Sequence, residues 1–348
     1  MRWLRANIRR QADWRAIVQV ALMLVLWLVL WSSLPGGYDQ LMLSNSLTNV
    51  MLALGLFLIL RAGRMSLAQA TLSGVGAYVA AYLDVNLHVN PLVALIPAAL
   101  AAALVGGLVG LLALRLEGFY FVIATLALSQ LFIVVVDSWQ SVTGGSNGIF
   151  GVPRLSSSTG GLFDFSWGGG YMGYALLLLI LSTVSYAVVG ILTGKTGVGR
   201  TITAIGADEV LASSLGVAVT KWRIVAFMVG SLIAGLAGAV QASYLGLAAP
   251  STYSLYESVL VVAMVFLGGR NSLVGVVLGA FALTYIPQWF NFGAQTQLVF
   301  LGGFFVVITV LLPGGLVPSV GAATRRVLYR RKALNDAVSR LSKEVTEV

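Results

Sequence analysis

The sequence has no cysteine, a single histidine and few charged residues. Only 9% of its 348 residues are charged, whereas a soluble globular protein carries roughly 25%. The lack of cysteine excludes disulfides and thiolate metal sites. The single histidine, His88, falls in a predicted loop, which argues against a Ser-His protease or a metalloprotease within a membrane.

The residues that are abundant are apolar and small. Hydrophobic residues make up 58% of the chain, the mean hydropathy is +0.93, and there are 40 glycines. Glycine is enriched where membrane helices pack closely. The composition therefore predicts an all-α integral membrane protein. The net charge of +9 is then better explained by basic cytoplasmic loops than by a nucleic-acid partner.

Ten segments are long and apolar enough to be predicted as membrane-crossing helices, which need about 20 such residues. They are 17–34, 41–60, 65–83, 91–114, 119–136, 171–193, 224–243, 254–269, 272–290 and 297–313. We therefore expect a transmembrane domain over 17–313, a basic N-terminus at 1–16 and a basic C-terminal tail at 314–348.

The distribution of basic residues predicts the orientation. If the N-terminus is cytoplasmic, Arg154 is the only one of the 21 Lys and Arg residues that falls outside. Basic residues concentrate in cytoplasmic loops, so ten spans with both termini in the cytoplasm fit this pattern. The longest outer loop is then 137–170, and the longest inner loop between spans is 194–223.

The predicted spans carry uncharged polar residues where ion-driven carriers bury titratable ones. Asp84, Asp137 and Glu257 fall at or near span ends. The polar stripes suggest a translocation path for a small polar or zwitterionic solute, although such residues also join helices by hydrogen bonds. The path candidates are Asn45, Asn49, Gln69, Ser73, Thr125 and Ser129.

The pattern Gly-Arg-x-Ser-Leu occurs twice, at 63–67 and 269–273. Both copies precede a predicted outward-running helix on the cytoplasmic side, where Ser66 and Ser272 could cap the helices. An internal repeat of the kind found in transporters and a convergent local solution both explain the match.

The inner loop at 194–223 carries a predicted short helix. Asp208 and Glu209 suit its N-terminal end, and Gly216 is expected to end it. The loop could dock a cytoplasmic partner or merely connect two spans. Just before it, "GILTGKTG" at 190–197 resembles a phosphate-binding loop but lacks the required spacing, so we expect no ATP site, cofactor or metal in this chain.

Several blocks in linked order resemble the LivM-type permease subunit of branched-chain amino acid ABC importers. They include "GRMSLAQATLSGVGAYVAAYL", "LRLEGFYFVIATLALSQ", "SVTGGSNGI", "GRTITAIGADEVLASSLGVAVTKWRIVAF" and "VFLGGRNSLVGVVLGA". The likeness runs from about 45 to 315. The chain departs from the sequences common in the family in having Arg64 where glutamine is usual. Its inner loop reads Ala-Asp-Glu at 207–209, where classical ABC permeases have Glu-Ala-Ala.

The resemblance implies a non-enzymatic subunit that is moved by a separate ATPase. The residues expected to couple to that ATPase are Gly206, Asp208, Glu209, Leu211, Leu215 and Gly216. The two Gly-Arg-x-Ser-Leu junctions would lie near the inner mouth. The inner-gate candidates there are Arg64, Ser66, Arg270 and Ser272.

The resemblance also implies partners: a second, related permease subunit, cytoplasmic ABC ATPases and a periplasmic solute-binding protein. The binding-protein docking candidates in the outer loop are Thr143, Gly144, Gly145, Ser146 and Asn147, although such a loop can also be a plain connector. The expected location is the bacterial inner membrane and the expected cargo is a branched-chain or other apolar amino acid. Urea, short amides and aromatic acids are alternatives, as is a stand-alone channel.

Overall fold

The structure is a computed structural model, and it describes residues 37–113, 116, 118–154, 171–289 and 302–303. The predicted first span, the basic N-terminus and the C-terminal tail lie outside the described residues. So does all but Gly302 and Gly303 of the predicted last span.

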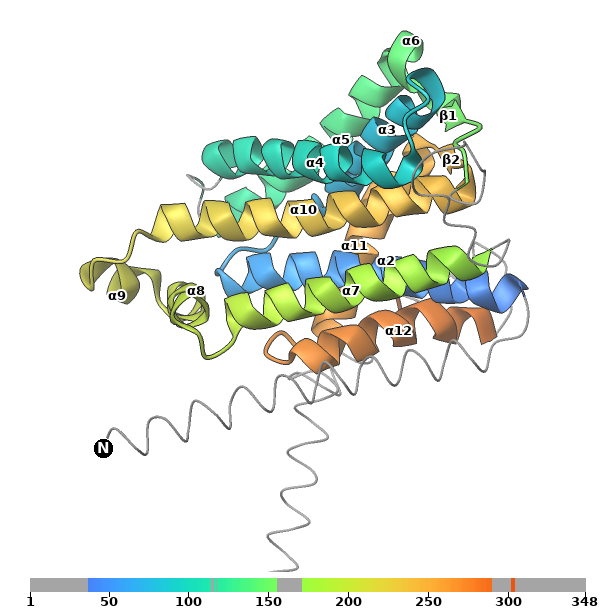
Figure 1. The fold of residues 1–348 in the computed structure, drawn as a ribbon. Coiled ribbons are helices and arrows are strands. Elements are labelled where there is room, and N and C mark those ends of the chain that lie inside the picture. Colours follow the sequence, from blue (N-terminus) through green and yellow to red (C-terminus); the bar gives the residue numbers. More distant parts are fainter. Residues whose placement is uncertain (1–36, 114–115, 117, 155–170, 290–301, 304–348) are drawn as a thin grey trace, which may run out of the picture.

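Each of the eight predicted spans that lie between the first and the last one in the sequence forms a helix (Figure 1). These helices are α2 (Gly37–Arg61), α3 (Gln69–Asn86), α4 (Pro91–Ala113), α5 (Phe119–Ser138), α7 (Tyr171–Thr193), α10 (Val219–Leu245), α11 (Leu255–Gly268) and α12 (Leu273–Trp289). Among the starts that differ from the prediction, α10 begins at Val219 instead of 224, and α3 begins at Gln69 instead of 65. Residues 65–68 are apolar enough to extend a hydropathy window, but they form a turn.

Short elements gather at the two ends of the bundle (Figure 1). At one end lie α8 (Gly197–Ala207) and α9 (Glu209–Ser214), which form the α8–α9 loop. At the other end lie α6 (Gln140–Thr143), η1 (Gly145–Asn147), η2 (Pro250–Tyr253) and the two strands, β1 (Ile149–Phe150) and β2 (Leu247–Ala248). The strands pair antiparallel, with Ile149 opposite Ala248, and this end is called the ribbon end.

Helix α2 lies at the centre, since 89% of its most apolar window is buried. It packs against α7, α10 and α12, and α10 packs in turn against α3 and α4. The hydroxyls on α2 are satisfied within the helix, because Ser44, Ser46 and Thr48 each donate to the carbonyl four residues earlier. This internal bonding lets a helix with several polar side chains remain buried.

The outer surface carries apolar stripes of the kind that face lipid. On α4 the exposed large side chains are Ile96, Leu100, Leu104, Leu108 and Leu111, which follow a helical spacing of three to four residues. A contiguous stripe of this length would be unfavourable in water. Six helices of the described chain are long and apolar enough to cross a membrane, so the structure is that of a multi-pass membrane protein. The count of ten spans stays a prediction.

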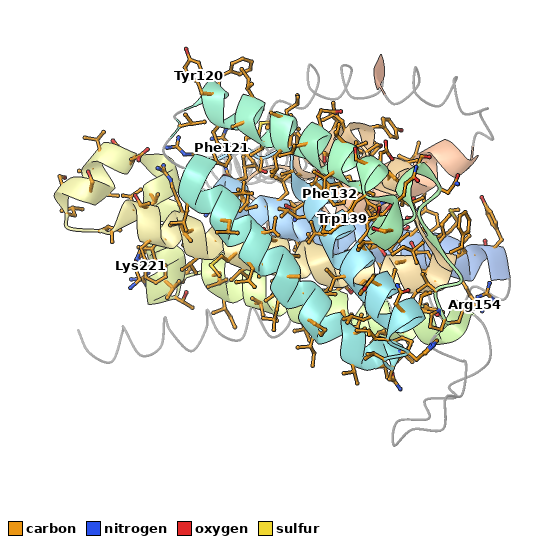
Figure 2. The ribbon with its side chains drawn as sticks, turned by 90° about the horizontal axis from the view of Figure 1, so that it is seen from above. Tyr120, Phe121, Phe132, Trp139, Arg154 and Lys221 are labelled. Atoms are coloured by element: carbon orange, nitrogen blue, oxygen red, sulfur yellow. The ribbon has the colours of Figure 1, made fainter. Side chains whose placement is uncertain are left out.

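Positive charge is distributed unequally between the two ends. Among the described Lys and Arg residues, only Arg154 lies at the ribbon end, and Figure 2 shows it at the opposite end of the bundle from Lys221. This asymmetry agrees with a cytoplasmic α8–α9 end, although the orientation itself remains a prediction.

Helices α3 and α10 meet at backbone distance through glycines. A Cβ built on Gly76 would overlap the backbone of Gly235, and one built on Gly238 would overlap the carbonyl of Ser73. Only glycine permits so close an approach between membrane helices.

We therefore expect Gly238→Ala to destabilise the protein. The added methyl group must push α3 away from α10, and overpacking of this kind costs about 1–3 kcal/mol. The measurement is the thermal unfolding midpoint in detergent, followed by the fluorescence of the eight tryptophans. Gly190→Ala is the matched control, because its Cβ would meet only a Leu273 methyl group at 3.5 Å. Equal midpoints for the two variants would contradict the close-packing account.

Candidate functional site

The α8–α9 loop is built from two capped helices in sequence. Thr196 accepts a hydrogen bond from the Gly199 N–H at the start of α8 (3.0 Å), and Asp208 accepts one from the Leu211 N–H at the start of α9 (2.9 Å). Gly216 follows α9 in a left-handed conformation, with φ +80°, which glycine adopts readily. The predicted short helix, with Asp208 at its start and Gly216 after its end, is thus confirmed.

Helix α9 points apolar side chains away from the bundle. Val210, Leu211 and Leu215 are all exposed, whereas Ala212 faces inward against Ile205 and Val219. Three large exposed apolar residues on one short loop form a surface suited to contact with another protein.

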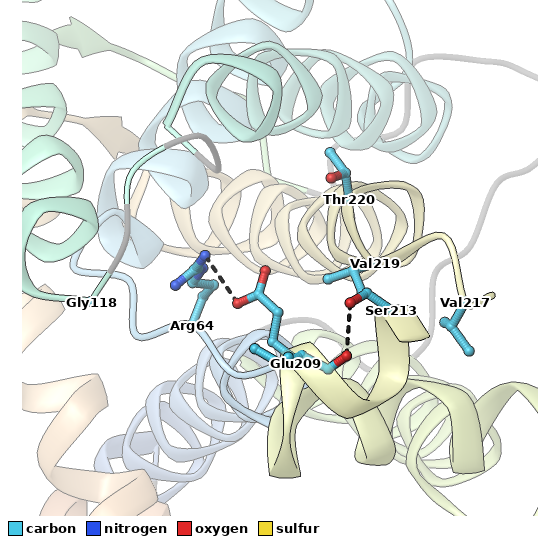
Figure 3. Close-up of a pocket in the computed structure, with 8 residues that line it drawn as sticks. Arg64, Gly118, Glu209, Ser213, Val217, Val219 and Thr220 are labelled. Atoms are coloured by element: carbon cyan, nitrogen blue, oxygen red, sulfur yellow. Dashed lines mark hydrogen bonds and ion pairs between the residues drawn. The ribbon is translucent and has the colours of Figure 1, made fainter. Parts of the chain in front are cut away.

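Glu209, the first residue of α9, is bound by two buried arginines. Arg223, in the first turns of α10, donates from Nη1 and Nη2 to the two carboxylate oxygens at 2.5 and 2.8 Å. Arg64, from the turn between α2 and α3, places Nη2 3.7 Å from the same carboxylate, as Figure 3 shows. The side chains of Arg223 and Arg64 are only 5% and 9% exposed, while that of Glu209 is 42% exposed. One partly exposed carboxylate therefore lies against two buried guanidiniums.

This environment lowers the pKa of the Glu209 carboxyl group below its ordinary range. The hydrogen bonds from Arg223 are the largest cause, and the positive charges of Arg223 and Arg64 add to it, while burial opposes the shift. The charged carboxylate is favoured because it accepts charge-assisted hydrogen bonds.

A cleft opens beside this ion cluster, with a volume of about 660 Å³ (Figure 3). It lies between α9, the start of α10 and the residue preceding α5. Its lining residues are Arg64, Gly118, Glu209, Val210, Ser213, Val217, Val219 and Thr220. The cleft is thus polar on the side of the ion cluster and apolar along Val217 and Val219.

The end of α8 packs directly on the end of α2. A Cβ on Gly206 would overlap the carbonyl oxygen of Arg61. The Arg61 side chain then joins two further segments: Nη2 donates to Thr203 of α8 at 3.0 Å, and Nη1 donates to Asn271 at 3.2 Å.

The two Gly-Arg-x-Ser-Leu junctions therefore lie at the same end of the bundle. Arg61, two residues before the first junction, bonds to Asn271 of the second. In both copies the glycine has a positive φ, +83° at Gly63 and +102° at Gly269. The serines act locally: Ser272 accepts from the Gly275 N–H in the first turn of α12, and Ser66 accepts from the Ala68 N–H just before α3.

The arginines of these junctions differ in their surroundings. Arg64 is buried against Glu209, whereas Arg270 is exposed. Of the four gate candidates, the structure thus joins Arg64 directly to the coupling candidates on α9.

The path candidates on α5 bond to the backbone of the α2–α3 turn. Thr125 accepts from the Leu67 N–H at 3.1 Å, and Ser129 donates to the Leu67 carbonyl at 3.0 Å. On α2, Asn49 donates to Thr284 of α12 at 3.1 Å, and Asn45 is half-buried.

The path candidates on α3 retain unused hydrogen-bonding capacity. Gln69 donates to the Gly230 carbonyl at 3.2 Å. Its Oε1 atom and the Ser73 hydroxyl are buried without a hydrogen-bond partner among the described residues.

The docking candidates form an ordered turn at the ribbon end. Thr143 is buried, and the single proton of its hydroxyl is shared between the Val136 carbonyl at 2.6 Å and the Trp139 carbonyl at 2.8 Å. Gly144 and Gly145 both have positive φ, which turns the chain into β1. Ser146 and Asn147 are exposed, as are Trp139 and Phe150 nearby.

Arg223 is the residue of this site that the sequence reading missed. In the sequence, Arg223 is one of several basic residues of the inner loop at 194–223, and nothing near it singles it out. Its partner Glu209 is 14 residues earlier and on a different helix, so no helical spacing links them.

Comparison with known proteins identifies the family. The profile of the "Branched-chain amino acid transport system / permease component" family matches residues 41–310. The chain belongs to this family. The resemblance to LivM-type permeases, noted above from sequence blocks, is thereby confirmed.

The LivM permease proteins of Salmonella typhimurium and Escherichia coli are 31% and 29% identical to this chain over alignments of 222 residues that cover 59% of it. The autoinducer 2 import permease LsrC of Photorhabdus laumondii is 33% identical over 47% of this chain. The chain spans about half the length of each of these relatives. No solved structure matches it significantly.

The lowered pKa of Glu209 predicts how attachment of α9 depends on pH. A carboxyl group whose pKa is depressed on folding stabilises the folded state fully above its unfolded-state value, and this contribution is lost as the pH falls toward the lowered value. We therefore expect protease cleavage within 194–223 to stay constant from pH 8 to pH 5 and to rise below about 4.5.

Glu209→Gln is the control for this experiment. It should be cleaved faster than the wild type at pH 7, because Arg223 and Arg64 no longer face the negative charge of Glu209. It should also lack the acid-dependent step. A wild-type step between pH 7 and 5, or the same step in the variant, would show that another group controls the loop.

Proposed function

We propose that this protein is the membrane-spanning permease subunit of an ATP-binding-cassette importer in a bacterial inner membrane. The observation that carries the proposal is the α8–α9 loop. It exposes Val210, Leu211 and Leu215 at its tip, while its base is joined to the α2–α3 turn through Glu209. A loop that is apolar outside and anchored inside is suited to receive force from a cytoplasmic ATPase.

In this proposal, ATP is hydrolysed in separate subunits. The stretch "GILTGKTG" gives no support for nucleotide binding here, because Gly194 and Thr196 connect helix α7 to helix α8. A phosphate-binding loop instead follows a strand. The chain's own part is to change conformation, with Gly206, Asp208, Glu209, Leu211, Leu215 and Gly216 forming the contact with the ATPase.

We further propose that the ribbon end receives a periplasmic binding protein. Thr143, Gly144 and Gly145 hold the turn in one conformation, and Ser146 and Asn147 are presented on it. A second, related permease subunit completes the pathway. Arg64, Ser66, Arg270 and Ser272 lie around the inner mouth and contribute to its gate.

The proposed cargo is a branched-chain or other apolar amino acid. The LivM names of two relatives support it, while the LsrC relatives are permeases for autoinducer 2 import and indicate that the family carries more than one class of solute. Urea, short amides and aromatic acids remain alternatives. An uncharged path would suit any of these; the unpartnered polar atoms of Gln69 and Ser73 could bond a solute, as could Asn45 and Asn49.

The first test changes the tip of α9. Leu215→Glu places a charge on an exposed apolar residue, so the chain should fold normally while co-purification with the ATPase and ATP-driven uptake fall at least about tenfold, the effect of losing roughly 1.4 kcal/mol at a contact. Leu87→Glu is the matched control, since Leu87 is also an exposed leucine and follows the C-terminal end of α3, away from the α8–α9 loop. Uptake that survives Leu215→Glu, with no ATPase bound, would favour a stand-alone channel.

The second test identifies the cargo. Calorimetric titration of the cognate binding protein should give heat with leucine, isoleucine or valine and none with urea, acetamide or benzoate. A response limited to one of the latter compounds would overturn the amino acid assignment but not the permease assignment.

A further inference from the structure

The ion cluster of Glu209, Arg223 and Arg64 joins three segments that are distant in sequence. Glu209 begins α9, Arg223 lies in α10, and Arg64 lies in the α2–α3 turn. Arg223 also donates from Nε to the Ala62 carbonyl at 3.2 Å. A single guanidinium thus holds the carboxylate of α9 and the backbone of the turn at once.

The α2–α3 turn is connected onward to α5. Both polar backbone groups of Leu67 are bound by α5 hydroxyls, the N–H by Thr125 and the carbonyl by Ser129. A continuous series of polar contacts therefore runs from α9 through residues 62–68 to α5.

Helix α5, at the end of this series, packs less against the rest of the described chain than any other of the six long apolar helices. Only 22% of its most apolar window is buried, compared with 89% for α2. A displacement of the turn is therefore resisted by little side-chain packing on α5, whereas α2 is held on several sides.

We propose that Arg223 and Arg64 are positioning residues that keep α9 attached to the α2–α3 turn throughout the transport cycle, so that a displacement of α9 is passed to α5. The proposal rests on the function proposed above. The attachment persists because separating Glu209 from Arg223 would break two charge-assisted hydrogen bonds to a guanidinium that is only 5% exposed, which is strongly unfavourable. The segments therefore move together.

A purely stabilising role of the ion cluster predicts a different outcome. Loss of the cluster would then lower the stability of the protein, and ATP hydrolysis and uptake would fall in parallel with the amount of folded complex. Loss of a mechanical connection lowers the amount of solute moved per ATP hydrolysed. This ratio, measured in proteoliposomes that hold the chain with its partner subunits, distinguishes the two.

The first variant is Arg223→Ala. We expect ATPase binding and hydrolysis to remain within about twofold of the wild type, and solute moved per ATP to fall at least about tenfold, since the total coupling between two sites in a protein typically amounts to about 5- to 150-fold. Arg223→Lys keeps the charge but not the forked geometry, so its ratio should be intermediate. Lys221→Ala is the matched control, because it removes an exposed positive charge two residues away and should leave the ratio unchanged.

A second experiment keeps the proposal testable if Arg223→Ala fails to fold. The chain has no cysteine, so Arg64→Cys with Glu209→Cys introduces one defined pair. In a complex whose other chains lack reactive cysteines, this variant should be uncoupled, and a short cleavable bis-maleimide should restore the ratio until it is cleaved.

The outcomes separate this proposal from the one it rests on. An unchanged ratio in Arg223→Ala, or a cross-link that fails to restore the ratio or blocks transport, overturns the persistent attachment. A wild-type chain that never associates with an ATPase overturns the proposed function itself.

Discussion

The turn between α2 and α3 must satisfy its backbone polar groups inside an apolar bundle. Residues 62–68 follow the end of α2. The N–H groups of Ala62, Gly63 and Arg64 still bond to carbonyls of α2, but the Ala62 carbonyl and the two polar groups of Leu67 have no helical partner, and unpaired groups of this kind are costly away from water. Other elements supply the partners: Arg223 bonds the Ala62 carbonyl, and Thr125 and Ser129 bond Leu67. Just after the turn, Ser258 of α11 accepts from the Ala70 N–H.

This requirement explains why polar side chains occur at those positions of otherwise apolar helices. Thr125 and Ser129 lie one turn apart on α5 because the two polar groups of a single residue, Leu67, face them. The same constraint places the turn in contact with α5, α10 and α11 together. A change in its position therefore cannot remain local, which is a property expected of a segment that lies between a force-receiving loop and a transport path.

Hydropathy and capping predicted the helices well, because those signals are local in sequence. The starts and ends of α4, α5 and α7 follow from apolar runs bounded by Pro91, Gly118 and Gly194, and α9 follows from Asp208 and Gly216. The start of α3 was misplaced since Met65, Leu67 and Ala68 are apolar although the chain turns there.

The contacts between elements were not predictable in the same way. Nothing in the spacing of Glu209 and Arg223 indicates that they meet, because their pairing depends on how α9 folds back onto α10. A stripe of Ser, Thr and Asn residues in the sequence likewise does not indicate whether their side chains bond another helix, a turn or a solute. The structure assigns Thr125 and Ser129 bonds to a turn, while Gln69 and Ser73 keep atoms unpartnered among the described residues.

The two Gly-Arg-x-Ser-Leu junctions show how one short pattern serves the same backbone purpose in two places. Each begins with a glycine of positive φ, as Gly63 follows α2 and Gly269 follows α11. Each then supplies a serine that binds an N–H near the start of the next helix. These two requirements account for the glycine and the serine without any common ancestry of the two halves.

The arginine of the pattern is where the copies diverge. Arg64 is buried on the Glu209 carboxylate, whereas Arg270 is exposed and its neighbour Asn271 makes the contact with Arg61. If a duplicated functional unit had been retained, both arginines would be expected to keep an equivalent carboxylate partner. The first junction instead carries the ion cluster, and the second contacts the end of α2 through Asn271 and Arg61, so the repetition reflects the geometry of a helix-to-helix turn more than a repeated function.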